Sequence, residues 1–322
     1  MLFAKLVEKL YRSNLFIRND NAYGVFYFGP DDFPGLHAEA YEFKSQDGHD
    51  LKGFFYYYEN PIPGQLVAFD HGMGNGHRAY MREIELLAQK GFLVYSYDHT
   101  GCMASGGENT GGFAQSLKDL DRCISALKAE PALQDRKIQV VGHSWGGFST
   151  MNISAIHPEI THVVSMSGFV SVEMMIGQVM TGPMKYFRKM LLDLERQTNP
   201  DYVDFDARES LAKSRAKVLL IYSDNDPTVK MDPHFVSLQE ALSHRENIQF
   251  LLVRNKGHNP NFTEDAVTYK DNFFKELTAA IKKKRLATPE QQQEFMARYD
   301  WQRMTTQDEG VWEQIVAHLK SE

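Results

Sequence analysis

The chain has 322 residues, of which 43% are hydrophobic, enough for one large α/β domain with an insertion or for two ordinary domains. Its net charge of −7, with both signs interspersed, argues against a nucleic-acid partner, and its two cysteines exclude a disulfide framework. No apolar run approaches the roughly 18 residues that span a bilayer, so we expect a cytoplasmic protein without stable membrane insertion.

Residues 1–37 begin with an amphipathic pattern and continue as an irregular segment. Met1–Leu10 interleaves charged residues with leucine and phenylalanine, which predicts a helix rather than a secretory signal. Pro30 and Pro34, among glycines and aspartates, then predict a loop. These residues form the first predicted unit of the chain.

The next segment is typical of an antiparallel hairpin, with Ala38–Ser45 and Leu51–Tyr58 joined by a turn containing Asp47 and Gly48. From Gln65 onwards, short apolar strands alternate with helical segments. The predicted strands are Leu66–Phe69, Phe92–Tyr97, Ile138–Val141, His162–Met166, Lys217–Tyr222 and Ile248–Val253. The predicted helices are Arg78–Gln89, Phe113–Lys128, Phe148–Ile156, Pro233–Ser243 and Glu264–Lys284. This alternation indicates an α/β fold with a mostly parallel sheet of about eight strands and helices on both faces.

One interruption stands out in this alternation. No strand is predicted between Gly168 and Arg215, and the methionine-rich segment Val172–Leu194 is too long for a tight connection. We predict a helical cap over the carboxyl edge of the sheet; an ordinary packed pair of helices is the alternative. Methionine adapts to irregular apolar surfaces, which suits a lid that faces substrate.

The end of the chain carries Trp301, Trp312, Ile315 and Leu319 after a polar stretch, which predicts one or two helices docked on the main domain. Nothing in this segment indicates a catalytic role. The sequence thus predicts five units: the N-terminal helix and irregular segment (1–37), the first part of the α/β core (38–169), the helical cap (170–215), the second part of the core (216–285) and a C-terminal helical extension (286–322).

The first chemical feature is Gly142-His143-Ser144-Trp145-Gly146, which follows an apolar strand and precedes a helix. A serine on a sharp strand-to-helix turn exposes its hydroxyl at the carboxyl end of the sheet, and small flanking residues permit the strained turn. Ser144 is therefore the candidate nucleophile. A glycine-rich turn with an incidental serine has the same pattern, so the choice depends on partners elsewhere in the chain.

Two later loops supply those partners. Asp226 lies in the loop after the Lys217–Tyr222 strand, where a carboxylate can accept a hydrogen bond from a histidine and fix its tautomer. Asp224 is the alternative acid. His258 follows the last predicted strand and is the candidate base. The order nucleophile, acid, histidine is the one expected for a serine hydrolase of this architecture.

The glycine-rich loop Phe69–Gly76 comes directly after the first strand of the alternating region. We expect the backbone N–H of Met73, together with the N–H of Trp145, to stabilise an oxyanion. A phosphate-binding loop is the competing interpretation. It fails because no Gly-Lys-Ser/Thr follows and no Gly-x-Gly-x-x-Gly fits.

From about Ala38 to Lys284, these motifs resemble the α/β-hydrolase superfamily, and most closely its monoglyceride-lipase and serine-aminopeptidase-like branch. The segment Tyr97–Gly106 resembles that branch's Asp-x-x-Gly-x-Gly-x-Ser motif, with Met103 in place of the second glycine. The resemblance implies a structural role for Asp98, which would brace the nucleophile turn. The resemblance is specific evidence for the fold and for the triad. It says little about the substrate, because members of the superfamily catalyse many different reactions.

We therefore expect a serine hydrolase that cleaves a carboxylic ester with a small to medium acyl group and requires no cofactor and no metal. An aminopeptidase or amidase is the first alternative, with Glu173 as a candidate ligand for a free amino terminus. An acyltransferase and a non-catalytic binding protein are the others. The last is disfavoured because all three triad positions are filled in order.

Overall fold

The computed structural model describes residues 2–74 and 76–322, so Met1 and Asn75 of the sequence motifs lie outside the described residues. Eight strands form one sheet in the order β1-β2-β4-β3-β5-β6-β7-β8. They are β1 (His37–Lys44), β2 (Asp50–Tyr57), β3 (Gln65–Asp70), β4 (Leu93–Tyr97), β5 (Lys137–His143), β6 (His162–Met166), β7 (Lys217–Ser223) and β8 (Ile248–Val253). The pairs β1–β2 and β2–β4 are antiparallel, and all other neighbouring strands pair in parallel. The predicted α/β fold with a mostly parallel sheet is confirmed.

Twelve α-helices lie in the described part of the chain. They are α1 (Leu2–Leu15), α2 (Met81–Gln89), α3 (Gln115–Ala129), α4 (Trp145–Ile153), α5 (Val172–Val179), α6 (Arg188–Thr198), α7 (Ala207–Lys213), α8 (Ser237–Leu242), α9 (Glu264–Lys282), α10 (Pro289–Met296), α11 (Trp301–Met304) and α12 (Glu309–Leu319). The segment after Arg285 thus holds three helices, where the sequence predicted one or two. Asp300 and Asp308 cap the last two and divide that segment.

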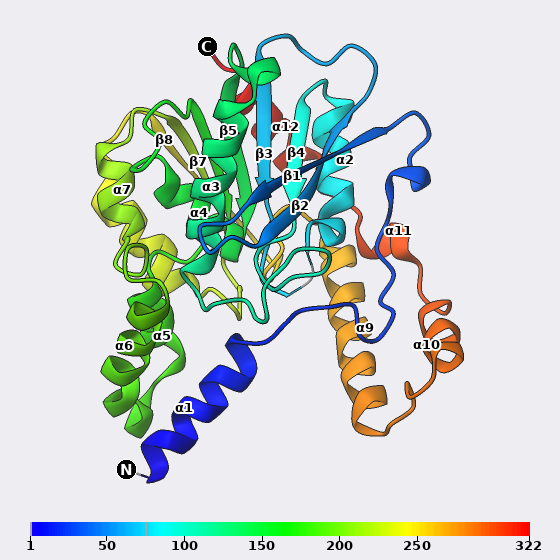
Figure 1. Ribbon diagram of the computed structural model, residues 1–322, viewed down its shortest axis with the longest axis vertical. Helices are drawn as coiled ribbons and strands as arrows, with labels where there is room; N and C mark the ends of the chain where they lie inside the picture. Colours follow the sequence, from blue (N-terminus) through cyan, green and yellow to red (C-terminus); the bar gives the residue numbers. More distant parts are fainter. Residues whose placement is uncertain (1, 75) are drawn as a thin grey trace.

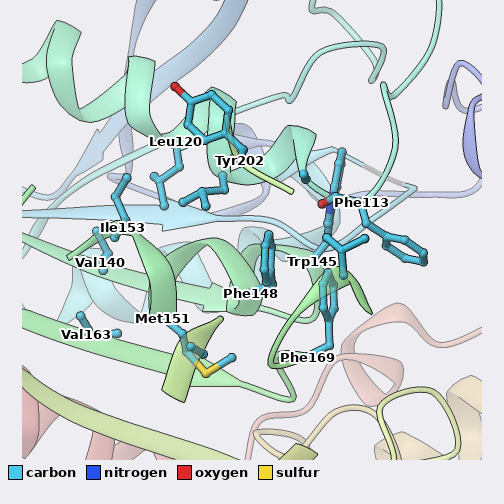
Figure 2. Close-up of a cluster of buried hydrophobic side chains, with 14 of the residues drawn as sticks. Phe113, Leu120, Val140, Trp145, Phe148, Met151, Ile153, Val163, Phe169 and Tyr202 are labelled. Atoms are coloured by element: carbon cyan, nitrogen blue, oxygen red, sulfur yellow. The ribbon is translucent and has the colours of Figure 1, made fainter. Parts of the chain in front are cut away.

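The two faces of the sheet carry separate apolar cores. On one face α3 and α4 cover the strands, and Figure 2 shows Phe148 and Met151 of α4 in one apolar cluster with Val140 of β5 and Val163 of β6. On the other face α2 and α12 pack against the sheet (Figure 1), and Trp312 of α12 is buried in that core. Strands buried on both faces explain why their sequences are continuously apolar rather than alternating.

Between β6 and β7 the chain forms the helices α5, α6 and α7, and residues 199–206 between α6 and α7 are irregular. Helices α5 and α6 pack against each other and extend away from the sheet, joined by the short 3₁₀ helix η4 (Gly182–Phe187) (Figure 1). Helix α7 instead packs against α4 and α8 beside the sheet. The pair α5–α6 is therefore the part of 170–215 that projects from the core.

No helix among residues 2–74 and 76–322 combines the length and the apolar character that crossing a membrane requires.

Candidate active site

Ser144 stands between the end of β5 and the first residue of α4, with φ 57° and ψ −109°. This left-handed conformation is costly for a residue other than glycine, by about 1–3 kcal/mol, and is characteristic of functional turns. The Ser144 N–H donates to the Met166 carbonyl at 2.8 Å, and the Ser144 carbonyl accepts from the Phe148 N–H at 3.0 Å. A Cβ at Gly146 would overlap the Asp70 carbonyl, so this tight turn requires its glycine.

A chain of hydrogen bonds joins three of the predicted site residues. The Ser144 hydroxyl lies 2.8 Å from His258 Nε2, and His258 Nδ1 lies 2.7 Å from Asp226 Oδ2. The other carboxylate oxygen of Asp226 accepts from the N–H groups of Thr228 and Val229, at 2.7 and 3.0 Å. The Asp226 side chain is buried, whereas His258 and Ser144 remain partly exposed. A buried carboxylate with three donors holds His258 in the tautomer whose Nε2 can accept a proton.

Asp224, the alternative acid, has a different partner. Its Oδ1 accepts from the Asn255 N–H at 2.9 Å and thereby ties the loop after β7 to the loop after β8. Two further bonds join the same loops, because Lys256 N–H donates to Ser223 Oγ at 3.0 Å and Gly257 N–H donates to Asn225 Oδ1 at 2.8 Å. The structure therefore brings Asp226, and not Asp224, to the imidazole of His258, and it braces the loops that carry both residues.

His143 links the nucleophile turn to the His258 loop. Its Nε2–H donates to the His258 carbonyl at 2.6 Å, and its Nδ1 accepts from the Tyr80 hydroxyl at 2.9 Å. Burial, with the nearby His258, lowers the pKa of His143 well below its usual value, so the ring stays neutral in this tautomer. Nothing in the sequence around Tyr80 signals this contact.

The glycine-rich loop after β3 lies against the nucleophile turn. His71 Nδ1–H donates to the Gly72 carbonyl at 2.7 Å, and His71 Nε2 accepts from the His99 N–H at 3.0 Å, which fixes the start of the loop. The Trp145 indole donates to the Phe113 carbonyl at 2.6 Å. Among the described residues, we find no hydrogen bond donated by the backbone N–H of Met73 or of Trp145.

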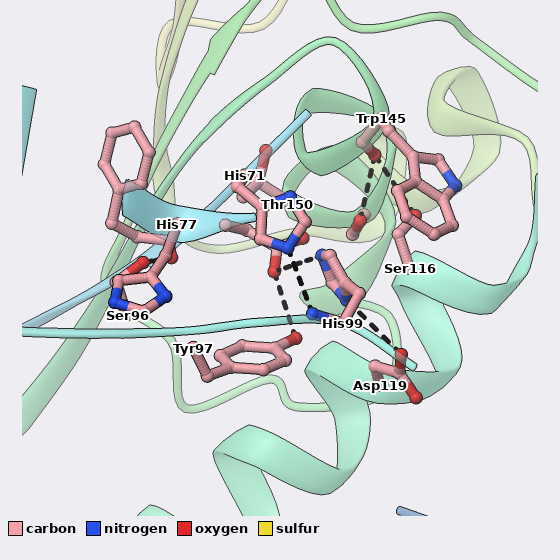
Figure 3. A network of polar contacts seen from close by, with 12 residues as sticks. His71, His77, Ser96, Tyr97, His99, Ser116, Asp119, Trp145 and Thr150 are labelled. Carbon is pink, nitrogen blue, oxygen red and sulfur yellow. Dashed lines mark hydrogen bonds and ion pairs between the residues drawn. The ribbon is translucent and has the colours of Figure 1, made fainter. Parts of the chain in front are cut away.

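A buried charged cluster supports this loop from below (Figure 3). His99 Nε2 lies 3.1 Å from Asp70 Oδ1, and His99 Nδ1 lies 3.4 Å from Asp119 Oδ2, with all three side chains fully buried. Burial opposes the charged imidazole, but the two carboxylates more than offset it and raise the pKa of His99 to about 9. The Tyr97 hydroxyl donates to Asp70 at 3.0 Å. This cluster could not be predicted from the sequence, because its members come from β3, the loop after β4 and α3.

The raised pKa of His99 predicts a stability that depends on pH. The folded state holds this proton more tightly than the unfolded state does, so the contribution is full below about pH 6.5 and is lost as pH rises through about 9. Urea unfolding should show this decline. We expect His99→Gln to lower the free energy of unfolding near neutral pH by about 3–5 kcal/mol, because two buried carboxylates lose their cation, and to flatten the alkaline decline. The matched control is His244→Gln on the surface, and an equal loss there would refute the assignment.

Asp98 holds a different segment from the one that the family resemblance implied. Its Oδ1 accepts from the backbone N–H of His77 at 2.9 Å and lies 2.7 Å from His77 Nδ1, while its Oδ2 accepts from Ala104 N–H at 3.1 Å. Burial opposes its charge, but His77 more than compensates and lowers the pKa of Asp98 to about 2. Asp98 thus braces the glycine-rich loop and the 98–106 segment. Met103, which replaces the glycine, keeps a left-handed conformation with φ 43°.

Glu173 lies exposed in the first turn of α5. It lines a cavity of about 480 Å³ with Lys185 and Arg196, and Ser144 is not among the described residues that line this cavity. The structure does not bring Glu173 to the Ser144–His258 pair.

The chain is similar in sequence to one protein family and in structure to several hydrolases. The family model Hydrolase_4, described as serine aminopeptidase, S33, matches residues 61–203. The esterase Pf2001 of Pyrococcus furiosus is similar in structure, with 20% identity and a TM-score of 0.58, over 80% of this chain and 96% of that one. The α/β hydrolase GrgF of a Penicillium species is 15% identical, with a TM-score of 0.53, over 81% of this chain and 99% of that one.

A putative dipeptidyl aminopeptidase IV of Bacteroides ovatus is 19% identical, with a TM-score of 0.56, over 77% of this chain and 36% of that one. No curated protein sequence matches the chain significantly. The sheet order, the strand-to-helix turn at Ser144 and these similarities agree, and the chain therefore has the fold of the α/β-hydrolase superfamily, with the serine aminopeptidase model matching residues 61–203.

Proposed function

We propose that the protein is a serine hydrolase that cleaves carboxylic esters of small to medium acyl groups through a Ser144–His258–Asp226 triad. The observation that carries the proposal is the continuous hydrogen-bond chain from the Ser144 hydroxyl through His258 to the buried Asp226 carboxylate. A nucleophile, a base and a residue that orients the base, all within hydrogen-bond reach, are the elements of acyl transfer.

In the proposed reaction, His258 Nε2 takes the proton of Ser144 as Oγ attacks the carbonyl carbon. The negative charge that develops on the carbonyl oxygen is stabilised by the N–H groups of Met73 and Trp145, each contributing on the order of 2.7–4 kcal/mol. The tetrahedral intermediate collapses as the ester C–O bond breaks and His258 returns its proton to the departing alkoxide. Water, deprotonated by His258, then attacks the acyl enzyme and releases the acid and free Ser144.

The ester assignment is supported by the structural similarity to an esterase and by the position of Glu173, which faces a separate cavity. An aminopeptidase is the second candidate, favoured by the serine aminopeptidase model and by the similarity to a putative dipeptidyl aminopeptidase. The two activities differ in one requirement, because an aminopeptidase must bind a charged amino terminus.

Two substrate series test this proposal. In the first, p-nitrophenyl esters of increasing acyl length are expected to be hydrolysed, with kcat/KM highest for short to medium chains. In the second, alanine p-nitroanilide is compared with its N-acetylated form. We expect little turnover of either, whereas rapid cleavage that requires the free amine would assign the protein as an aminopeptidase. Labelling by a fluorophosphonate probe separates both from a binding protein, because the absence of a Ser144 adduct would contradict hydrolysis of either kind.

A further inference from the structure

One apolar face of helix α1 packs against the protein and holds this helix beside the projecting pair α5–α6. Val7, Tyr11 and Leu15, spaced by four residues, are buried in the main core. The Tyr11 hydroxyl donates to Oε1 of Glu195 on α6 at 2.7 Å, and Glu195 Oε2 accepts from the Phe113 N–H at 3.0 Å. This buried junction fixes the rotation of α1 about its own axis.

Because α1 is held in this way, a second apolar stripe faces outward. Phe3, Leu6 and Leu10 are 58%, 49% and 54% exposed. The Phe3 ring lies 5.4 Å from the ring of Phe187 at the end of η4, and the adjacent Tyr186 is 79% exposed. Figure 1 shows the first turns of α1 beside the far end of the α5–α6 pair. We call Phe3, Leu6, Leu10 and Tyr186 the apolar tip. Four large apolar side chains exposed on adjoining elements indicate an interaction surface.

The charge of the same two segments is opposite to that of the whole chain. Residues 2–15 contain three cations and one anion, and residues 179–190 contain three cations and no anion, which gives a net charge of +5 in a chain of −7. The cations are Lys5, Lys9, Arg12, Lys185, Arg188 and Lys189. Exposed aromatic and leucine side chains beside clustered lysine and arginine are the composition of helices that lie in a membrane interface.

We propose that the apolar tip docks on the surface of a lipid bilayer that contains anionic phospholipid. Phe3, Leu6, Leu10 and Tyr186 insert at the boundary between headgroups and acyl chains, and the neighbouring lysines contact the anionic headgroups. A second copy of the chain is a poorer partner, because pairing two tips would bring two surfaces rich in lysine and arginine together. This inference does not depend on the proposed hydrolysis.

Co-sedimentation with vesicles tests the docking. The protein is used as Ser144→Ala, so that lipid hydrolysis cannot alter the vesicles. We expect it to pellet with vesicles of phosphatidylcholine and phosphatidylglycerol at low ionic strength and to remain in solution with phosphatidylcholine alone. The pair Lys5→Glu and Lys185→Glu should weaken binding to anionic vesicles at least about tenfold, given the attraction of each cation to the surface. The pair Leu6→Glu and Leu10→Glu should abolish it.

The matched controls lie far from the tip. Leu252→Glu on β8, where the leucine is 43% exposed, and the pair Lys282→Glu and Lys283→Glu at the end of α9 should bind as the parent does. Thermal unfolding must show that the Leu6 and Leu10 double variant is folded. If it is not, Tyr186→Ser on η4 replaces it and should weaken vesicle binding.

Three results would overturn the proposal. The first is that the protein does not pellet with anionic vesicles, and the second is that the parent and the tip variants bind equally well. The third is that sedimentation velocity shows a dimer of the parent and none of the Leu6 and Leu10 double variant. The last would assign the stripe to a second copy. With the residue at position 144 restored to serine, the tip variants should hydrolyse a water-soluble ester at the parental rate, so failure of docking and failure of hydrolysis are separate outcomes.

Discussion

Replacing Ser144 with alanine is expected to lower kcat for a short p-nitrophenyl ester by about a million-fold, the scale at which a hydrolase loses its nucleophile. Only Oγ is removed, so the acyl enzyme cannot form, while the N–H groups of Met73 and Trp145 remain. The residual rate should still exceed that of the uncatalysed reaction. Initial rates on purified protein measure the change. A rate near that of the wild type would assign the nucleophile elsewhere.

The strained turn at Ser144 supplies the control for this variant. Alanine keeps a Cβ at φ 57°, whereas glycine adopts this conformation freely. Ser144→Gly should therefore be as inactive as Ser144→Ala and more stable than it by about 1 kcal/mol. Thermal unfolding of the two variants separates the loss of chemistry from the loss of fold. If Ser144→Gly were the less stable variant, the turn would not be strained.

Asp226→Asn is expected to lower kcat by about 10⁴-fold, with little change in fold. The N–H groups of Thr228 and Val229 both donate to Oδ1, so they hold the oxygen of the new amide in that position. The amide NH₂ must then face His258 Nδ1 as a donor. This forces the imidazole proton onto Nε2, where it blocks acceptance of the Ser144 proton. The pH dependence of kcat, together with the rate at neutral pH, measures the change.

Asp224→Asn is the matched comparison, two residues away on the same loop. Its oxygen accepts from the Asn255 N–H, which an amide oxygen can also do, so the brace between the two loops survives. We expect less than about a tenfold loss of kcat. A larger loss at position 224 than at position 226 would move the acid to Asp224.

The strands could be predicted from sequence because burial on both faces leaves a local pattern. The apolar run Ile138–Val141 predicts a strand without any knowledge of its neighbours in the sheet. The observed strand β5 is longer by only one residue before this run and two residues after it. Helix α4 begins at Trp145, earlier than the predicted Phe148, because two glycines after Ser144 obscure the start of the periodic pattern. Glycine weakens a helical signal even where the fold requires it.

The supports of the site could not be predicted in this way. His99 meets Asp70 and Asp119 only because β3 and β4 are adjacent in the sheet and α3 covers them. Tyr80 reaches His143 across 63 positions of sequence. Such contacts depend on the order of the strands in the sheet, and the spacing of apolar residues along the sequence does not reveal that order. Asp226 and His258 could be proposed because they follow strand ends, and strand ends meet at one edge of a parallel sheet.

Helix α12 has a consequence for how the protein is made. It packs on the sheet with Trp312 and Ile315 buried, and the Leu319 carbonyl accepts from Gln139 of β5 at 2.9 Å. Every strand is translated before this helix. The part of this face at β6 and β7, which α12 contacts, therefore stays uncovered during synthesis until residues 309–319 have left the ribosome. Through that interval the nascent chain exposes the kind of apolar surface that chaperones bind.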